Sequence, residues 1–326
     1  MSPRHFCTYF DHNYIPRALV MLESLFECYP EAILHIICLT QECFEAMKQL
    51  SYPFLRLYSL CELESADPQL AATRDTRSLI EYYFTLTPCL PLFLLRHQGL
   101  PSVTYLDADM IFFSSPAPLF DEAPDADVLI TPHRFSPRLA ELERFGLYNV
   151  SWMTFCNTPN GMKCLEWYRA ACLEWCFDRV EDDRFADQKY LDAFSRLFTG
   201  VHAIEHKGAG VAPWNIAEAD VHKEGGLLMA GDAPLIFYHA QAFHNIAGPF
   251  YSSGCRQYKT PVTAKQKELI FKPYAQLYRR AVKKAKKLSI RALKAGPRLK
   301  QAQGGAIGIY RQIRKEWKAS SLIVQF

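Results

Sequence analysis

The chain has no long hydrophobic run, and this absence argues against an integral membrane protein. A helix that spans a bilayer needs about 20 consecutive apolar residues. The best candidate, residues 85–95, is shorter and contains Pro88 and Pro91. Residues 1–6 also lack the apolar core of a secretory signal. We therefore expect a cytoplasmic protein.

Paired cysteine motifs are absent as well. None of the 11 cysteines forms a C-x-x-C pair, so the spacing typical of structural zinc sites does not occur. Cys172 and Cys176 are four residues apart, with Cys164 in the same pattern, which predicts a buried helical stripe rather than metal ligation. An odd number of scattered cysteines fits a reducing compartment.

Acidic residues are almost missing from the C-terminal part. Residues 272–326 contain 15 Lys and Arg but one acid, Glu316, which leaves 22 basic and 33 acidic residues in positions 1–271. The formal net charge of +3 hides this asymmetry. With 49% hydrophobic residues in 326, the chain can bury a sizeable core. We predict a globular domain over 1–271 and a basic, partly helical tail over 272–326.

The order of the expected elements indicates the fold class. Strands are predicted at residues 6–10, 34–39 and 54–58, with helices at 16–28 and 41–50 between them. Further helices are expected at 76–95, with a break or kink at its prolines, and at 161–177. An alternating strand–helix pattern predicts an α/β fold with a mostly parallel central sheet and helices on both faces.

Two carboxylates interrupt the apolar stretch 103–113. Asp107 and Asp109 lie between strand-forming residues, and no Lys or Arg occurs within the stretch. Buried charges are costly unless something pairs them. The C-terminal edge of a strand in an open α/β sheet is where ligands bind. A divalent cation shared by the two carboxylates there would resolve the cost, although a turn capped by aspartates is the simpler alternative.

Several short segments follow one another in an order that matches a known family. They are 10–14 (Phe-Asp-His-Asn-Tyr), 107–109 (Asp-Ala-Asp), 148–150 (Tyr-Asn-Val), 187–188 (Asp-Gln) and His239 at the end of the last strand. Together they resemble nucleotide-sugar glycosyltransferases with the GT-A fold, closest to retaining, family-8-like bacterial enzymes. Segments 76–85 and 212–215 are similar to those of uncharacterised bacterial glycosyltransferases. The similarity spans about residues 6–244.

The resemblance assigns roles to the matching positions. It implies three metal ligands, a pair of catalytic residues beside the anomeric carbon, and a nucleotide-sugar site that includes one metal ligand. The assigned metal ligands are Asp107, Asp109 and His239; the catalytic pair is Asp187 and Gln188; the donor-binding residues are Thr8, Asp11, Asn13, Tyr14, Arg77, Asp107 and Asn149. Structural alternatives stay open: an ordinary capped turn at 11–14, a helix cap at Asp187, and a buried hydrogen-bonded His239.

The implied reaction moves a sugar, with retention, from a nucleotide diphosphate donor to a glycan or lipid-linked acceptor in cell-surface glycan synthesis. A UDP-sugar and a hexosyl group are favoured. Two carboxylates and one imidazole suit Mn²⁺, with Mg²⁺ second. The family's Lys-Pro-Trp after the metal histidine is absent, and Arg74, Arg77 or His244 are the substitutes for its lysine contact to diphosphate.

Two other functions compete with this interpretation. A haloacid-dehalogenase-like phosphatase also carries Asp-x-Asp after a strand but requires Thr or Val at position 111, where this chain has Ile111. The second alternative is a non-catalytic membrane-associated adaptor. In either case the tail interleaves basic with apolar and aromatic residues, which predicts a peripheral contact with an anionic membrane on its inner face rather than with nucleic acid.

Overall fold

The computed structural model describes residues 3–288 and 305–325. A seven-stranded sheet with the order β3-β2-β1-β4-β7-β6-β8 forms its centre, and four of the six strand pairings are parallel. The strands of this sheet are β1 (His5–Phe10), β2 (Ile33–Cys38), β3 (Leu55–Ser59), β4 (Ser102–Leu106), β6 (Val128–Pro132), β7 (Tyr148–Cys156) and β8 (Val201–Ala203). The mixed α/β architecture with a mostly parallel sheet is confirmed.

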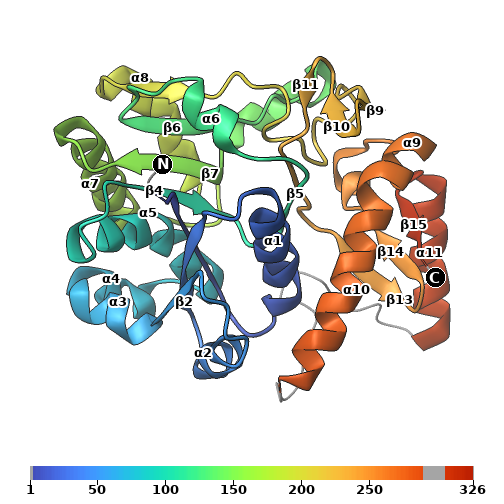
Figure 1. Ribbon diagram of the computed structural model, residues 1–326, viewed down its shortest axis with the longest axis horizontal. Coiled ribbons are helices and arrows are strands. Elements are labelled where there is room, and N and C mark those ends of the chain that lie inside the picture. The colour runs from blue at the N-terminus through green and yellow to red at the C-terminus, as the bar shows by residue number, and fades with distance from the viewer. Residues whose placement is uncertain (1–2, 289–304, 326) are drawn as a thin grey trace.

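Both faces of the sheet are covered, because successive strand residues enter different hydrophobic clusters. Phe6 and Leu106 belong to the cluster beneath the first helix, whereas Cys7 and Tyr105 belong to the cluster on the opposite face. Figure 1 shows the helices around the sheet. They are α1 (Ile15–Cys28), α2 (Gln41–Lys48), α3 (Leu60–Ala66), α4 (Pro68–Thr73), α5 (Leu79–His97), α6 (Ala117–Asp121), α7 (Pro159–Glu174) and α8 (Phe194–Leu197), with 3₁₀ turns η1 (Arg74–Thr76), η2 (Pro137–Phe145) and η3 (Gln188–Ala193).

Local sequence signals fix several of these elements. A capping box between Ser78 and Glu81 starts α5, and the helix then runs through Pro88 and Pro91 without ending. Of the break or kink that the prolines allow, a break is therefore not observed, and both prolines are buried. The sequence of residues 150–155 allows an antiparallel or an edge strand, and the structure has the first: β7 lies inside the sheet, antiparallel between β4 and β6.

Smaller sheets complete the fold beside the central one. Strand β5 (Met110–Phe112) pairs with β12 (Phe237–His239), outside the main sheet. The others are a three-stranded sheet of β9 (Val221–Glu224), β10 (Leu227–Ala230) and β11 (Ala233–Pro234), and another of β13 (His244–Ala247), β14 (Phe250–Ser252) and β15 (Leu322–Val324). The remaining helical segments are η4 (Cys255–Tyr258), α9 (Ala264–Gln266), η5 (Lys267–Phe271), α10 (Lys272–Lys287) and α11 (Gly305–Lys318).

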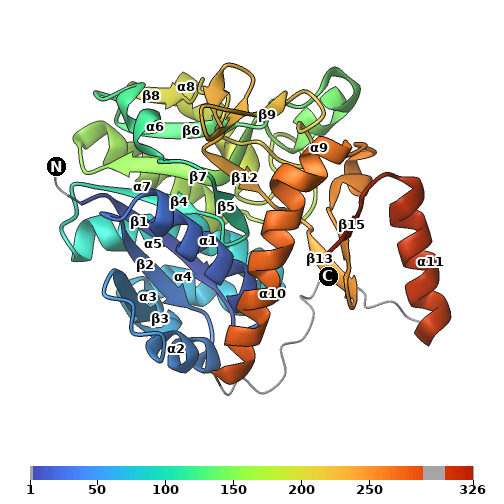
Figure 2. The same ribbon diagram turned by 45° about the vertical axis from the view of Figure 1, so that its right-hand side comes forward.

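The basic C-terminal segment is packed on the rest of the molecule. Helix α10 lies along α1 (Figures 1 and 2), and its Tyr274, Ala281 and Ala285 are buried in the same hydrophobic cluster as α1. Helix α11 lies against β13 and β15. The division at 271/272 falls within a continuous helical segment that begins at α9, and the autonomy of the two parts stays a prediction. Residues 289–304 of the predicted tail lie outside the described residues. No helix in the described part is long and apolar enough to cross a bilayer.

Candidate active site

The two carboxylates of the Asp-Ala-Asp motif lie between β4 and β5. The backbone N–H of Asp107 donates to the Ser151 carbonyl of β7 at 3.1 Å, and this bond ends the β4–β7 ladder. On the other side, β12 pairs with β5 so that His239 is opposite Met110, and the N–H of Ala240 donates to the Asp109 carbonyl at 2.9 Å. Main-chain bonds therefore place His239 beside both aspartates.

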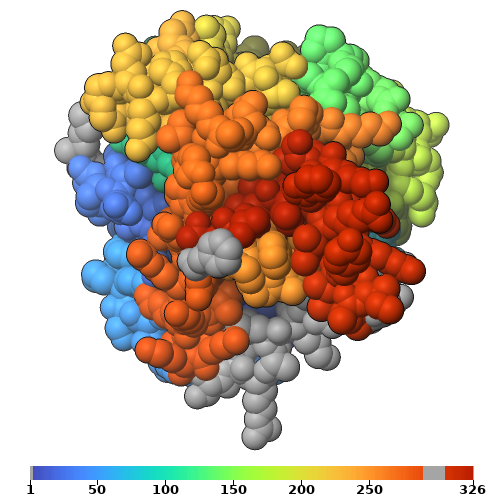
Figure 3. All heavy atoms as spheres, turned by 90° about the vertical axis from the view of Figure 1, so that its right-hand side faces the viewer, coloured from blue at the N-terminus to red at the C-terminus, as the bar shows by residue number. Residues whose placement is uncertain are grey.

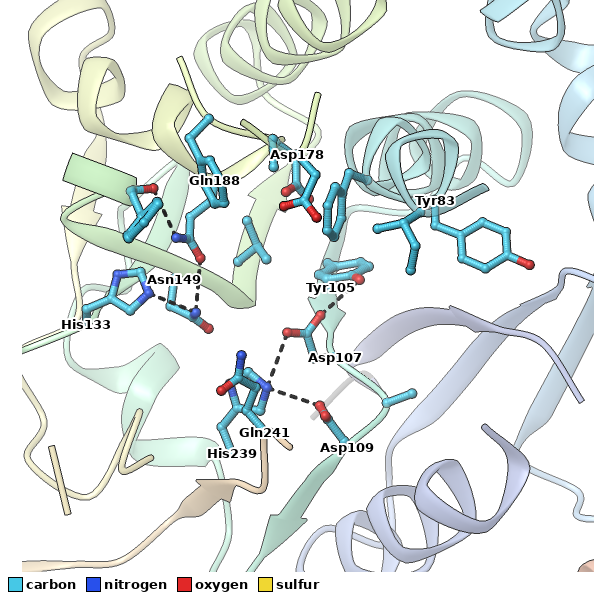
Figure 4. A pocket seen from close by; sticks show the side chains of 18 of the residues that line it. Tyr83, Tyr105, Asp107, Asp109, His133, Asn149, Asp178, Gln188, His239 and Gln241 are labelled. Atoms are coloured by element: carbon cyan, nitrogen blue, oxygen red, sulfur yellow. Dashed lines mark hydrogen bonds and ion pairs between the residues drawn. The ribbon is translucent and has the colours of Figure 1, made fainter. Parts of the chain in front are cut away.

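The three side chains converge on one point. His239 Nε2 is 3.0 Å from Asp109 Oδ1 and 3.6 Å from Asp107 Oδ2, and one ligand atom from each residue lies within 4.8 Å of the others. Figure 4 shows the cluster at the wall of a cavity. Two carboxylate oxygens and one imidazole nitrogen this close together are a suitable donor set for a divalent cation.

Burial and mutual charge shift the pKa values of this cluster. Burial raises the pKa of Asp107 to about 6, and His239 only partly offsets this. Burial acts in the same direction on Asp109, but His239 outweighs it and lowers the pKa of Asp109 below its usual value. Burial would lower the pKa of His239, yet Asp109 and then Asp107 raise it. The imidazole thus lies between two carboxylates that both favour a positive charge at this position.

Each carboxylate is also held by a tyrosine hydroxyl. Tyr14, at the start of α1, donates to Asp109 Oδ2 at 3.0 Å. Tyr105, on β4, donates to Asp107 Oδ1 at 3.1 Å. Hydrogen bonds of this kind orient ligands around a metal. Tyr105 precedes Asp107 by two positions, so strand alternation could have identified it from the sequence.

The cluster opens into a cavity of about 450 Å³. Its wall is rich in aromatic residues and, among the described residues, contains no Lys or Arg. The lining side chains include Tyr9, Phe10, Asp11, Tyr14, Ile80, Tyr83, Phe84, Tyr105, Asp107, Asp109, His133, Phe135, Phe145, Asn149, Asp178, Phe185, Asp187, Gln188, Trp214, His239, Gln241 and Tyr258. Six further predicted site residues, Asp107, Asp109, Asn149, Asp187, Gln188 and His239, therefore share this cavity with Asp11 and Tyr14 from the first turn.

Asn149 and Gln188 lie across the cavity from the metal cluster and bind each other. Asn149 Nδ2 donates to Gln188 Oε1 at 3.2 Å and lies 3.1 Å from His133 Nε2. Gln188 Nε2 donates to the Phe145 carbonyl at 3.1 Å. Burial lowers the pKa of His133 to about 3, so this ring stays neutral and can accept from Asn149. His133 belongs to no recognisable motif, so its role could not be predicted from the sequence.

Asp187 is a buried acid in the same wall, with 3% of its surface exposed. Burial raises its pKa to about 7, opposed by a hydrogen bond from Thr87 and assisted by the charge of Asp107. No side-chain cap of η3 by Asp187 is present. A structural capping role is therefore not observed, and burial makes the acid far easier to protonate near neutral pH than an exposed aspartate.

The first turn has a clear structural role. Asp11 Oδ1 accepts from the backbone N–H of Asn13 at 2.9 Å and of Tyr14 at 3.2 Å, which is an Asx turn leading into α1. Asp11 and Tyr14 line the cavity, whereas Asn13 does not. Asn13 Nδ2 instead donates to Asp11 Oδ2 at 3.3 Å.

The structure does not bring Thr8 or Arg77 to the cavity. Thr8 is fully buried in β1. The Arg77 guanidinium donates to Thr85 Oγ1 and to the carbonyls of Cys172 and Leu173 at 2.7–2.9 Å. These carbonyls lie in the last turn of α7, which lacks helical partners for them. The guanidinium of Arg77 therefore links α5 to α7 through these hydrogen bonds.

The other basic substitutes are engaged elsewhere too. Arg74 is paired with Glu64 at 2.5 Å, and His244 Nε2 lies 2.9 Å from the Gln312 amide of α11. Neither lines the cavity. Trp214, which the sequence analysis placed only in a similar segment, does line it and packs edge-on against His239 with ring centroids 5.5 Å apart.

Comparisons with known proteins give relatives and a fold. The chain is 30% identical over 278 residues to the uncharacterized protein YfnD of Bacillus subtilis, covering 84% of this chain and 88% of YfnD. It is 29% identical over 251 residues to YfnF of the same organism, covering 74% of this chain and 82% of YfnF. No protein-family model matches.

Among solved structures, the galactosyltransferase LgtC in complex with donor and acceptor sugar analogs superposes with a TM-score of 0.53 at 15% identity. The match covers 88% of this chain and 97% of LgtC. At this identity the likeness establishes the fold, which is the GT-A fold of glycosyltransferases, and the predicted resemblance is confirmed to that extent.

Proposed function

The chain belongs to the family of the Bacillus subtilis protein YfnD and has the GT-A fold, and from this we propose that it is a metal-dependent glycosyltransferase. The observation that carries the proposal is the convergence of Asp107, Asp109 and His239 at the edge of a GT-A sheet. This donor set opens into a cavity whose wall also contains Asp187 and Gln188.

The donor we propose is a nucleotide diphosphate sugar, with UDP and a hexosyl group favoured. A bound Mn²⁺ or Mg²⁺ would neutralise the charge that develops on the departing diphosphate. Because no Lys or Arg among the described residues lines the cavity, the bound ion itself would supply this positive charge, and His239 would hold it as a neutral imidazole. Tyr14 supplies an aromatic face for the base, while the Asp11 carboxylate holds the turn that positions it.

On the sugar side, Asp187 and Gln188 are the proposed catalytic pair. An oxocarbenium-like transition state is stabilised by an acid or amide oxygen on the protein face of the sugar, as carboxylates do in glycosidases. Asn149 Nδ2 donates to the Gln188 carbonyl oxygen, and this bond fixes the orientation of the amide. Such support is consistent with retention of the anomeric configuration.

The experiment that tests the proposal is a thermal-stability screen with UDP, GDP, ADP and dTDP, each with and without Mn²⁺. A ligand present at 100 times its dissociation constant stabilises the native state by about 2.7 kcal/mol. We expect stabilisation by one diphosphate that requires Mn²⁺ and disappears in the Asp109→Asn variant. An adaptor without a nucleotide site would show no such shift.

For the acceptor we propose a glycan or lipid-linked sugar at the inner face of an anionic membrane. The apolar residues of α10 cannot make this contact, because Tyr274, Ala281 and Ala285 are buried against α1. Helix α11 offers a different surface: Ile307, Tyr310 and Trp317 are each at least 64% exposed. Figure 3 shows α10 and α11 on one face of the molecule.

Arg311, Arg314 and Lys318 of α11 lie on the same side of the helix as these three residues, by their spacing. Its acid, Glu316, is buried and paired with Arg256 at 2.7 Å. Cations contribute about 1 kcal/mol each near an anionic leaflet. We expect salt-sensitive binding to phosphatidylserine vesicles that is lost in Tyr310→Ser/Trp317→Ser and kept in the control Leu227→Ser. Equal vesicle binding by both variants would contradict the membrane contact. Tighter binding of the wild type to nucleic acid than to vesicles would identify nucleic acid as the partner of this surface instead.

A further inference from the structure

Arg17 is a buried cation for which the site described so far has no use. It lies on α1 and is 6% exposed, and within the described residues the ion pairs of Asp107 and Asp109 are with His239 rather than with Arg17. Its side chain donates to the Phe243 carbonyl at 3.0 Å. A buried guanidinium is costly unless its surroundings compensate the charge, so its location requires an explanation.

The surroundings are two tyrosine rings. The guanidinium carbon is 4.8 Å from the ring centroid of Tyr14 and 5.8 Å from that of Tyr278 on α10. A cation within about 6 Å of an aromatic face is attracted by the ring. Arg17 therefore links the first residues of α1 to α10.

Tyr14 connects this cation to the metal cluster. Its hydroxyl donates to Asp109 Oδ2 at 3.0 Å, while the other oxygen, Oδ1, is the one 3.0 Å from His239 Nε2. The hydroxyl thus holds one oxygen and leaves the other directed at the point where the three ligands converge. A cation against the phenol ring polarises it and strengthens this hydrogen bond.

The support beneath Arg17 comes from the C-terminal part of the chain. Phe243 lies between β12 and β13 and packs edge-on against Tyr274 and Tyr278 of α10, with centroids 4.6 and 6.0 Å apart. The carbonyl that receives Arg17 is therefore fixed by α10. The continuous series of contacts runs from α10 through Arg17 and Tyr14 to Asp109.

We propose that Tyr14 and Arg17 are positioning residues that set the Asp109 carboxylate for metal binding and make this setting depend on the packing of α10. The inference rests on the metal site of the proposed function. It concerns the hydroxyl of Tyr14, and is therefore separate from any contact between its ring and a nucleotide base.

The test measures Mn²⁺ affinity of the full chain by titration calorimetry without nucleotide, so that base stacking does not contribute. Loss of a hydrogen-bonding partner of a metal ligand typically weakens metal affinity 10–100-fold. We expect Tyr14→Phe and Arg17→Met each to weaken Mn²⁺ affinity by a factor in this range. Arg17→Lys, which keeps the charge but has one donor centre, should bind with intermediate affinity.

The matched control is Tyr258→Phe, another cavity tyrosine whose hydroxyl donates to Gln241 at 2.6 Å rather than to a metal ligand. It should bind Mn²⁺ as the wild type does. Melting temperatures without metal should be alike for Tyr14→Phe and Tyr258→Phe, and the increase caused by Mn²⁺ should be smaller for Tyr14→Phe alone.

Wild-type affinity in Tyr14→Phe, or an equal loss in Tyr258→Phe, would overturn the inference while leaving the metal site intact. A wild-type chain that does not bind Mn²⁺ at all would overturn the metal site of the proposed function and this inference with it. Where the wild type does bind Mn²⁺, loss of this binding in Asp109→Asn shows that the ion occupies the proposed site, so that the result for Tyr14→Phe tests the inference alone.

Discussion

Replacing Asp187 with asparagine should stabilise the metal-free protein at alkaline pH. Asp187 is 3% exposed, and burial raises its pKa from 3.8 to about 7. The folded protein therefore holds a proton at this site that the unfolded chain releases, and linkage makes stability fall as pH rises between these two pKa values. The fall begins near pH 4 and levels off above pH 7.

The magnitude follows from the size of the shift. Each pKa unit corresponds to about 1.4 kcal/mol. Relative to low pH, the raised pKa of Asp187 therefore lowers the free energy of unfolding by about 4 kcal/mol at pH 8 and about 2 kcal/mol at pH 5. Asparagine has no such dependence. The difference in unfolding free energy between variant and wild type should therefore move in favour of Asp187→Asn by about 2–3 kcal/mol from pH 5 to pH 8.

Urea denaturation at both pH values, in the presence of a chelator, measures this difference. The comparison of two proteins at each pH removes the contributions of all groups that they share. Asp125→Asn is the control, an Asp→Asn replacement at an exposed position, measured in the same way. A difference for Asp187→Asn that stays constant between pH 5 and pH 8 would refute the reasoning.

Three further predictions concern the proposed reaction. Asp109→Ala or His239→Ala should abolish Mn²⁺-dependent nucleotide binding and turnover while the fold persists by circular dichroism; full activity without added metal would rule out the site. The new glycosidic linkage should keep the donor's configuration by NMR, and Asp187→Ala or Gln188→Ala should lower kcat far more than donor affinity, since such groups act at the transition state. Arg77→Gln should lower the unfolding free energy by about 2 kcal/mol, because buried carbonyls lose a charged donor, and should leave nucleotide affinity unchanged; weakened nucleotide binding would instead support the role that the sequence predicts for Arg77.

The sequence was a good guide wherever local pattern decides structure. The alternating elements from β1 to β3 were predicted because each strand and helix carries its own periodicity. The cluster of Asp107, Asp109 and His239 was predictable for a different reason. Two carboxylates within an apolar strand need a partner, and the resemblance named His239 as that partner.

The sequence was a poor guide wherever a side chain chooses between competing partners. Arg77 matched a family segment, but the unpaired carbonyls at the end of α7 compete for its guanidinium and bind it. The apolar residues of α10 have the spacing of a membrane-facing helix and equally that of a core helix. Only the opposing surface of α1 decides between the two, and periodicity does not encode it.

The β5–β12 ladder has a consequence for the kinetics of folding. It joins Met110 to His239, which lie far apart in the chain, so the entropy of closing a long loop must be overcome before His239 meets Asp107 and Asp109. Interactions that form late are absent from the folding transition state, and strengthening them slows unfolding without accelerating folding. A bound ion would therefore lengthen the lifetime of the native protein rather than help the chain to reach it.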